Sequence, residues 1–176
     1  MLESLITSKT RVKLLLKLFL NTNSTGHLRG MATELGESSN SIRIELNRFI
    51  KGGLLTSEYN KNKKFYKANT EHPLYSDINN ILCKMVGIDK LVEGVTSQIG
   101  NLKSAYLTGN LASGLDSNII ELALIGENLD EKYITNLVNK ARKLMEREIK
   151  YLLLTSDQMD YFLKDKPTLL IWKKDE

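Results

Sequence analysis

The sequence of 176 residues has one cysteine, two prolines and two histidines, and no apolar run near the ~20 residues that a membrane-spanning helix requires. A single cysteine, Cys83, excludes an internal disulfide and a zinc cluster built on thiolates. Its apolar helical surroundings predict a buried structural thiol rather than a nucleophile. Because the N-terminus has an acid at Glu3 and no basic region, we expect no secretory signal and a cytoplasmic chain.

Positive charge is concentrated in the first half of the chain. The sequence has 25 Lys and Arg and 21 Asp and Glu, for a net charge of +4. Residues 1–87 carry 13 basic and 7 acidic side chains, so +6, whereas residues 88–176 carry 12 and 14, so −2. A basic half joined to a slightly acidic one is typical of a nucleic-acid-binding module fused to a second domain.

The first 36 residues contain the signals of two helices. Ser8 is a suitable N-cap for a helix that extends to about residue 20, where apolar residues recur at helical spacing. Residues 21–26 are turn formers and should be a loop. A short helix is predicted over 28–35, and Gly36 should end it in the left-handed conformation.

The next segment predicts a recognition helix followed by a wing. Ser38 or Ser39 should cap a helix over 40–51, which two glycines end. Two β-prone runs, 54–59 and 64–68, follow and flank a basic tip. Three helices and a hairpin predict a winged helix-turn-helix DNA-binding domain over 1–70, with the recognition helix at 39–51 and a basic wing at 59–65.

On a helical wheel, one side of the recognition helix is apolar and the other is polar. Arg suits guanine and Asn suits adenine by bidentate hydrogen bonding, so Asn40, Arg43 and Asn47 are predicted to read bases and Ser41 to contact phosphate. Glu45 and Glu58 lie nearby in the sequence and should weaken phosphate attraction. A solvated face without a ligand is the alternative. The predicted DNA-binding residues are Asn40, Ser41, Arg43, Asn47, Arg48, Lys51, Lys61, Lys63 and Lys64.

A linker or dimerisation helix is predicted over 71–87, and an α/β pattern over 88–176. Pro73 suits the first turn of the linker helix, and Gly87 should end it. Helices and strands then alternate in a way that predicts a mixed sheet. The expected helices are 88–99, 130–146 and 156–162, and the expected strands are 105–108, 119–125, 149–154 and 168–172.

The second half resembles a minimal nucleotidyltransferase domain. The predicted strand 105–108 is followed by Gly109-Asn110 and then by Ala112-Ser-Gly114. The next strand contains Glu121 and ends at Gly126. The whole chain resembles a prokaryotic transcriptional-regulator family that fuses a winged helix to such a domain. The resemblance implies an α+β fold, with an N-terminal winged helix-turn-helix and a C-terminal nucleotidyltransferase-like domain whose sheet is mixed.

Departures from the signature predict that the domain is not catalytic. The resemblance implies two Asp residues that hold Mg²⁺, but Ile119 and Glu121 stand at those positions. Asn110 stands where the signature has Ser, and Ser113 where it has Arg. Since phosphoryl transfer needs hard oxygen ligands, we expect no catalytic residue, no metal and no cofactor. Gly109, Asn110 and Glu121 would mark a degenerate nucleotide pocket.

The leading interpretation is therefore a cytoplasmic transcriptional regulator that binds double-stranded DNA as a homodimer. Its C-terminal domain would serve dimerisation or the sensing of an unknown effector. One alternative is an active Mg²⁺-dependent nucleotidyltransferase, which would need Asp116 beside Glu121. Another is a protein-interaction module of the antitoxin kind. The operator, the regulated genes, the direction of regulation and the dimer interface do not follow from the sequence.

Overall fold

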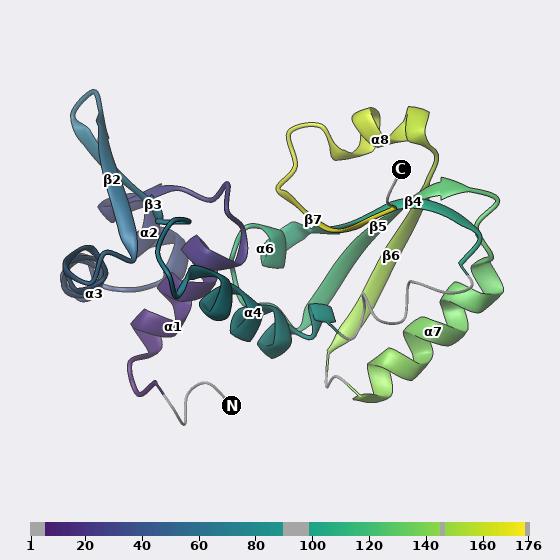
Figure 1. Ribbon diagram of the computed structural model, residues 1–176, viewed down its shortest axis with the longest axis horizontal. Coiled ribbons are helices and arrows are strands. Elements are labelled where there is room, and N and C mark those ends of the chain that lie inside the picture. The colour runs from purple at the N-terminus through teal and green to yellow at the C-terminus, as the bar shows by residue number, and fades with distance from the viewer. Residues whose placement is uncertain (1–5, 90–98, 145–146, 175–176) are drawn as a thin grey trace. The chain divides into compact units, whose positions relative to one another are not determined.

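The computed structural model describes residues 6–89, 99–144 and 147–174. Its fold is mixed α+β, as expected (Figure 1). The chain divides into two compact units, 1–85 and 86–176, and the division falls in the last turn of helix α4. The finer division into 1–70, 71–87 and 88–176 stays a prediction. The helix expected over 88–99 lies largely outside the described residues.

The first unit opens with a helix that changes type partway along its length. Helix α1, Lys9–Leu15, begins at Ser8, whose Oγ accepts the N–H of Arg11 at 3.2 Å. The chain continues as a π-helix, η2, over Leu16–Leu20, and all five of its residues are buried. The expected helix is therefore correct in extent, although its last turn is wound more widely than an α-helix.

Helices α2 and α3 form the helix-turn-helix. Helix α2, Leu28–Leu35, ends at Gly36, whose φ of 63° lies in the left-handed region that glycine tolerates best. Helix α3, Ser39–Lys51, is capped by Ser38, whose Oγ accepts the N–H of Ser41 at 3.0 Å. The apolar side of α3 is buried in the core, as predicted.

The wing is a hairpin of β2, Leu55–Asn60, and β3, Lys63–Ala68. A two-residue turn joins the strands, which are one residue longer at the tip than predicted. A short strand that was not predicted, β1, Gly26–His27, pairs with β3 and gives the sheet order β1-β3-β2. The hairpin extends away from the helices of this unit (Figure 1). Together these elements make a winged helix-turn-helix.

Helix α4, Tyr75–Val86, closes the first unit and packs one side against the end of η2. Nδ2 of Asn79 donates to the carbonyl oxygens of Phe19 at 2.7 Å and Leu20 at 3.2 Å, at the end of η2. The Tyr75 ring stacks on Phe19 with centroids 6.1 Å apart. Cys83 is half-buried rather than buried as predicted, and its thiol donates to Oδ1 of Asn79 at 3.7 Å.

The second unit is built on a four-stranded sheet of order β6-β5-β4-β7. The edge strand β6 is parallel to its neighbour β5, whereas β4 is antiparallel to both β5 and β7. The mixed sheet was predicted, and four of the eight strand ends shift, by one to four residues. The strands are β4, Asn101–Thr108, β5, Ile119–Glu127, β6, Glu148–Leu154, and β7, Thr168–Lys173.

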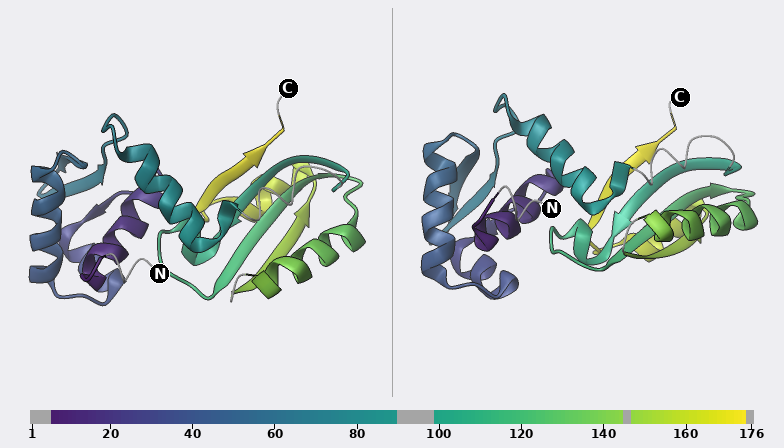
Figure 2. Two further views of the ribbon diagram at one scale, coloured as in Figure 1. Left: turned by 60° about the horizontal axis from the view of Figure 1, so that its bottom comes forward. Right: turned by 90° about the horizontal axis from the view of Figure 1, so that it is seen from below.

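Helices cover the two faces of this sheet unequally. Helix α7, Glu131–Leu144, lies along one face, where the hydroxyls of Thr135 and Tyr151 are 2.9 Å apart (Figure 2). Helix α8, Ser156–Leu163, packs through Leu163 on the opposite face. Because α8 is short, Leu152 and Leu170 on that face stay about half exposed.

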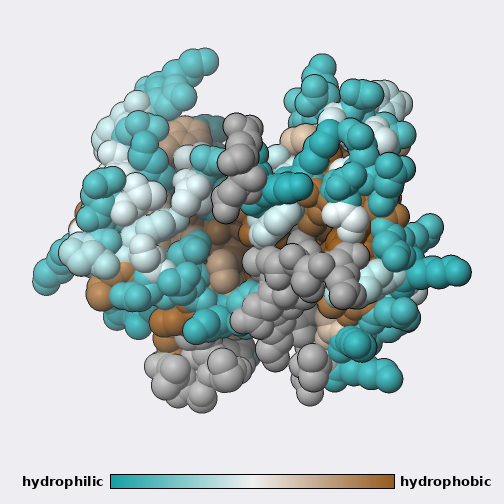
Figure 3. All heavy atoms as spheres, turned by 45° about the vertical axis from the view of Figure 1, so that its right-hand side comes forward, coloured by the Kyte–Doolittle hydropathy of each residue, from teal (hydrophilic) through white to brown (hydrophobic). Residues whose placement is uncertain are grey.

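No helix within the described ranges is long and apolar enough to cross a membrane. On the face drawn in Figure 3, hydrophobic residues show as separate areas between hydrophilic ones.

Candidate nucleic-acid interface

Helix α3 presents a polar face to solvent. Asn40, Arg43 and Asn47 are exposed and share this face with Lys51. Ser41 is half-buried, and its Oγ lies 2.8 Å from that of Ser38, so the hydroxyl is engaged at the helix cap. The three residues predicted to read bases therefore stand free at the surface, whereas Ser41 takes part in capping.

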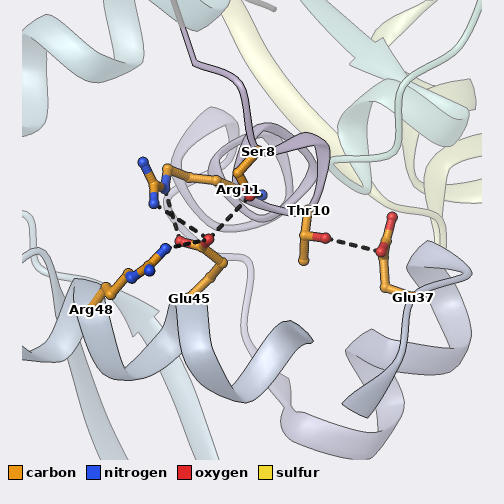
Figure 4. A network of polar contacts seen from close by, with 6 residues as sticks. All are labelled: Ser8, Thr10, Arg11, Glu37, Glu45 and Arg48. Carbon is orange, nitrogen blue, oxygen red and sulfur yellow. Dashed lines mark hydrogen bonds and ion pairs between the residues drawn. The ribbon is translucent and has the colours of Figure 1, made fainter. Parts of the chain in front are cut away.

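The one acidic residue of α3 points away from this face. Glu45 is only 5% exposed and accepts hydrogen bonds from three side chains (Figure 4). Nε of Arg11 lies 2.8 Å from Oε2, Nη1 of Arg48 lies 2.9 Å from Oε1, and Oγ of Ser8 lies 3.0 Å from Oε1. Two guanidinium groups therefore offset the charge of the Glu45 carboxylate. The expectation that Glu45 weakens phosphate attraction stays a prediction.

The environment of Glu45 also fixes its protonation state. Burial alone would raise the pKa of this carboxyl group. Hydrogen bonds from Arg11 and Ser8, with the charges of Arg11 and Arg48, outweigh burial and hold the pKa below its usual range. Glu45 is thus ionised at neutral pH and joins α1 to α3 in a fixed geometry.

A second ion pair joins α1 to the turn before α3. Nζ of Lys13 lies 2.6 Å from Oε1 of Glu37. Oγ1 of Thr10 donates to Oε2 of Glu37 at 2.9 Å, as Figure 4 shows. The hydrogen bond from Lys13 lowers the pKa of Glu37 most, and the hydrogen bond from Thr10 lowers it further. Two carboxylates therefore hold α1 against the helix-turn-helix, Glu37 in the turn and Glu45 midway along α3.

Arg11 is a candidate contact that sequence analysis did not find. Its side chain is one-third exposed, and it shares a carboxylate with Arg48, whose side chain is 59% exposed. Two guanidinium groups around one carboxylate leave a net positive charge beside the polar face of α3. Arg11 lies 34 residues before Glu45, so no local pattern in the sequence could reveal this pairing.

The lysines of the wing are not equivalent. Lys61 is exposed in the turn with a φ of 53°. Nζ of Lys64 lies 5.5 Å from the Tyr66 ring centroid and 5.9 Å from that of Tyr59, a cation–π arrangement that occupies the ammonium group. Side chains alternate along a strand, so Lys63 projects from the opposite face, together with Lys67. Lys67 is exposed and was not predicted.

The nucleotidyltransferase-like corner lies in the second unit, where β4 meets a short helix, α6, Gly109–Ala112. This short helix is not among those expected from the sequence. Gly109 has a φ of 66°, and a Cβ on it would lie 2.6 Å from Oε1 of Glu121. Asn110 is exposed on α6. The structure therefore brings Gly109 and Glu121 into contact, and the carboxylate covers the glycine.

The donor set at this corner does not fit a magnesium–nucleotide site. Glu121 pairs in register with Lys150 on β6, so the two side chains project from the same face of the sheet. Ile119, the other ligand position, has no oxygen to donate. Asp116 is ion-paired with Nη1 of Arg147 at 3.0 Å. Among the described residues, no group of three or more His, Cys, Asp or Glu is placed to hold a metal ion.

Comparison with known proteins finds likeness in solved structures only. No family model matches the chain, and no curated protein matches it. Reduced HlyU from Vibrio cholerae N16961 is 13% identical and covers 49% of this chain and 83% of its own, with a TM-score of 0.39. A Sulfolobus solfataricus protein named as a candidate nucleotidyltransferase is 24% identical and covers 52% of this chain and 82% of its own, with a TM-score of 0.38.

A toxin-antitoxin structure with AMP-PNP is 18% identical and covers 50% of this chain and 74% of its own, with a TM-score of 0.39. Each of these three structures covers about half of the chain. Scores and identities this low support no statement about function, which therefore has to come from the geometry of the chain itself.

Proposed function

We propose that the chain is a sequence-specific, DNA-binding transcriptional regulator that acts in the cytoplasm as a homodimer. The observation that carries this proposal is the outward face of α3, which presents amide and guanidinium groups while its one acid, Glu45, is turned inward and ion-paired. A helix of this kind fits the major groove, where Asn and Arg read adenine and guanine.

The exposed residues divide into two roles. Asn40, Arg43 and Asn47 read base edges from α3. The remaining cations contact phosphates on either side of the groove and supply the salt-dependent part of the affinity. These phosphate contacts are Arg48 and Lys51 on α3, Arg11 on α1, and Lys61, Lys63 and Lys67 on the wing.

The test is fluorescence-anisotropy titration of the protein with duplexes from its own upstream region and with scrambled duplex, at ~150 mM salt, where non-specific binding is weak. Arg43→Ala should weaken binding to the native duplex by about 1–3 kcal/mol and leave binding to scrambled duplex nearly unchanged. Lys140→Ala, which removes an exposed charge on α7, is the matched control and should change neither affinity.

Two results would contradict the proposal. If the wild-type protein shows no preference for native over scrambled duplex, a protein-interaction role becomes the better explanation. Equal losses on both duplexes for Arg43→Ala would mean that Arg43 contacts phosphate rather than a base.

The second unit is proposed to be a non-catalytic relative of nucleotidyltransferases that serves dimerisation or the sensing of an effector. Three observations support this proposal: the covered Gly109, the lysine in register with Glu121, and the ion-paired Asp116. Mg²⁺-dependent consumption of labelled nucleotide, lost in Glu121→Gln, would contradict it and favour the enzymatic alternative.

A further inference from the structure

Helix α4 has an apolar stripe that does not pack into the core of the first unit. One side of the helix, with Tyr75, Asn79 and Leu82, packs on the core described above. A neighbouring stripe keeps large apolar side chains in solvent, and Leu74 is 54% and Ile81 50% exposed. Ile78 and Met85 complete it and are half-buried.

The spacing of this stripe is that of a helix-pairing seam. Its residues, Leu74, Ile78, Ile81 and Met85, are separated by four, three and four positions, which is the a/d pattern of paired helices. Leu74 precedes α4 but belongs to its first turn, because its carbonyl oxygen accepts the N–H of Ile78 at 3.0 Å. The stripe is therefore continuous over the length of the helix.

The charges beside the stripe identify what pairs with it. Asp77 and Lys84 are exposed, and each directly precedes a stripe residue, Ile78 and Met85. They occupy the same flank two helical turns apart and carry opposite charges. When two such helices run antiparallel, residues at this flank position face each other, so Asp77 lies opposite the partner's Lys84 and Lys84 opposite the partner's Asp77.

We propose that α4 binds the α4 of a second copy of this chain in an antiparallel pair. In this register Ile78 packs against the partner's Ile81, and Leu74 packs against the partner's Met85. The stripe is thus complementary to itself under a two-fold axis, as a symmetric dimer interface must be. In a parallel pair, Asp77 and Lys84 would instead face the flank that carries Tyr75 and Leu82, and neither charge would meet an opposite one.

This inference specifies the interface of the homodimer in the proposed function and rests on it for its biological role only. Self-association is measured without DNA, by sedimentation velocity across a concentration series of the full chain. We expect a reversible monomer–dimer equilibrium in the micromolar range. A monomer at every concentration would overturn the interface and leave DNA binding to be judged by the anisotropy titration.

The first variant tests the apolar seam. Ile81→Lys should raise the dimer dissociation constant by about a hundredfold, because each copy loses the burial of one isoleucine side chain. Leu152→Lys, at an equally exposed leucine of the sheet unit, is the matched control and should leave the constant unchanged. Circular dichroism of both variants checks that they fold. Equal effects of the two substitutions would overturn the proposal.

A charge exchange tests the direction of the pair. Asp77→Lys and Lys84→Asp should each weaken the dimer several-fold, since each places like charges face to face twice in the interface. The double variant D77K/K84D restores both ion pairs and should recover most of the wild-type constant. Additive losses in the double variant would exclude the antiparallel register. Both side chains are exposed, so folding is not at stake.

Discussion

Helix α3 and strand β5 each place a glutamate, Glu45 and Glu121, close to a candidate binding surface, and the surroundings of the two carboxylates differ. Glu45 is buried and held by Arg11, Arg48 and Ser8, so it leaves the outward face of α3 to cations and amides. Glu121 stays at the surface of the sheet and covers Gly109.

The difference shows that the function of an acid depends on which groups surround it. In the first unit the carboxylate organises positive charge beside a proposed DNA surface. In the second it is in register with Lys150, on a strand that has Ile119 two residues earlier. In the part of the chain that the structure describes, no group of three or more His, Cys, Asp or Glu is placed to hold a metal ion. The following substitutions test each side of this comparison.

The largest effect is expected at Glu45. Glu45→Gln should lower the free energy of unfolding by about 1–2 kcal/mol, because it removes the buried charge that two arginines face. The value is below that for fully buried pairs, since Arg48 is largely exposed. Urea denaturation of the variant measures the loss. Glu58→Gln, at an exposed acid of the wing, is the control and should have little effect.

The Glu45 contribution should also depend on pH in a defined direction. The pKa of Glu45 is lowered in the folded state, so its stabilisation is present above the unfolded pKa of ~4.3 and is lost as pH falls through the folded pKa. The difference between wild type and Glu45→Gln should therefore be constant near neutral pH and shrink below pH ~4. A difference that grew with acidity would contradict this assignment.

Two glycines with similar backbone conformation come next, with a smaller effect expected at Gly36 and a comparable one at Gly109. Gly36→Ala and Gly109→Ala both place a side chain at positive φ, 63° and 66°, which costs about 1 kcal/mol. A Cβ at Gly36 meets nothing within 4 Å, whereas one at Gly109 meets the Glu121 carboxylate. Gly109→Ala should therefore cost about 1 kcal/mol more, because Glu121 must leave its rotamer.

The comparison is sharpened by repeating both substitutions in a Glu121→Ala background. There the extra cost at Gly109 should disappear and the two glycine substitutions should destabilise equally in thermal unfolding. An extra cost that survives the removal of Glu121 would mean that its carboxylate is not what fills the space over Gly109.

The smallest effect is expected on the wing. Lys63→Ala should reduce the slope of log affinity against log salt by about one, since it removes one phosphate contact. Lys64→Ala should change the slope less, because the Lys64 ammonium group lies against two tyrosine rings. Anisotropy titrations at several salt concentrations compare the two. A larger change for Lys64→Ala would reverse the assignment of the wing faces.

Local signals in the sequence predicted the first unit well. The Ser8 cap, the glycine that ends α2 and the cap of α3 each depend on residues within four positions of one another, so their physics is visible in the sequence. The hairpin is equally local. The predicted base-reading residues are exposed as the helical wheel required, and their role in DNA binding stays a prediction.

Features that depend on distant residues were missed. Strand β1 has only two residues and exists because it pairs with β3, about 40 positions later. The inward position of Glu45 depends on Arg11, and the two faces of the wing become distinct only when the tyrosines are placed around Lys64. In the second unit, the contact of Glu121 with Gly109 requires the β4–β5 register.

The amide of Asn79 gives α4 a mechanical role. By holding the last two carbonyls of η2, it makes α4 move with the winged helix as one body rather than as a flexible tether. In the dimer that we propose, the separation and the tilt of the two recognition helices are then set by the crossing of two α4 helices. That crossing would then set the spacing of the two DNA half-sites, and lengthening α4 by a turn would change which DNA the proposed dimer can span.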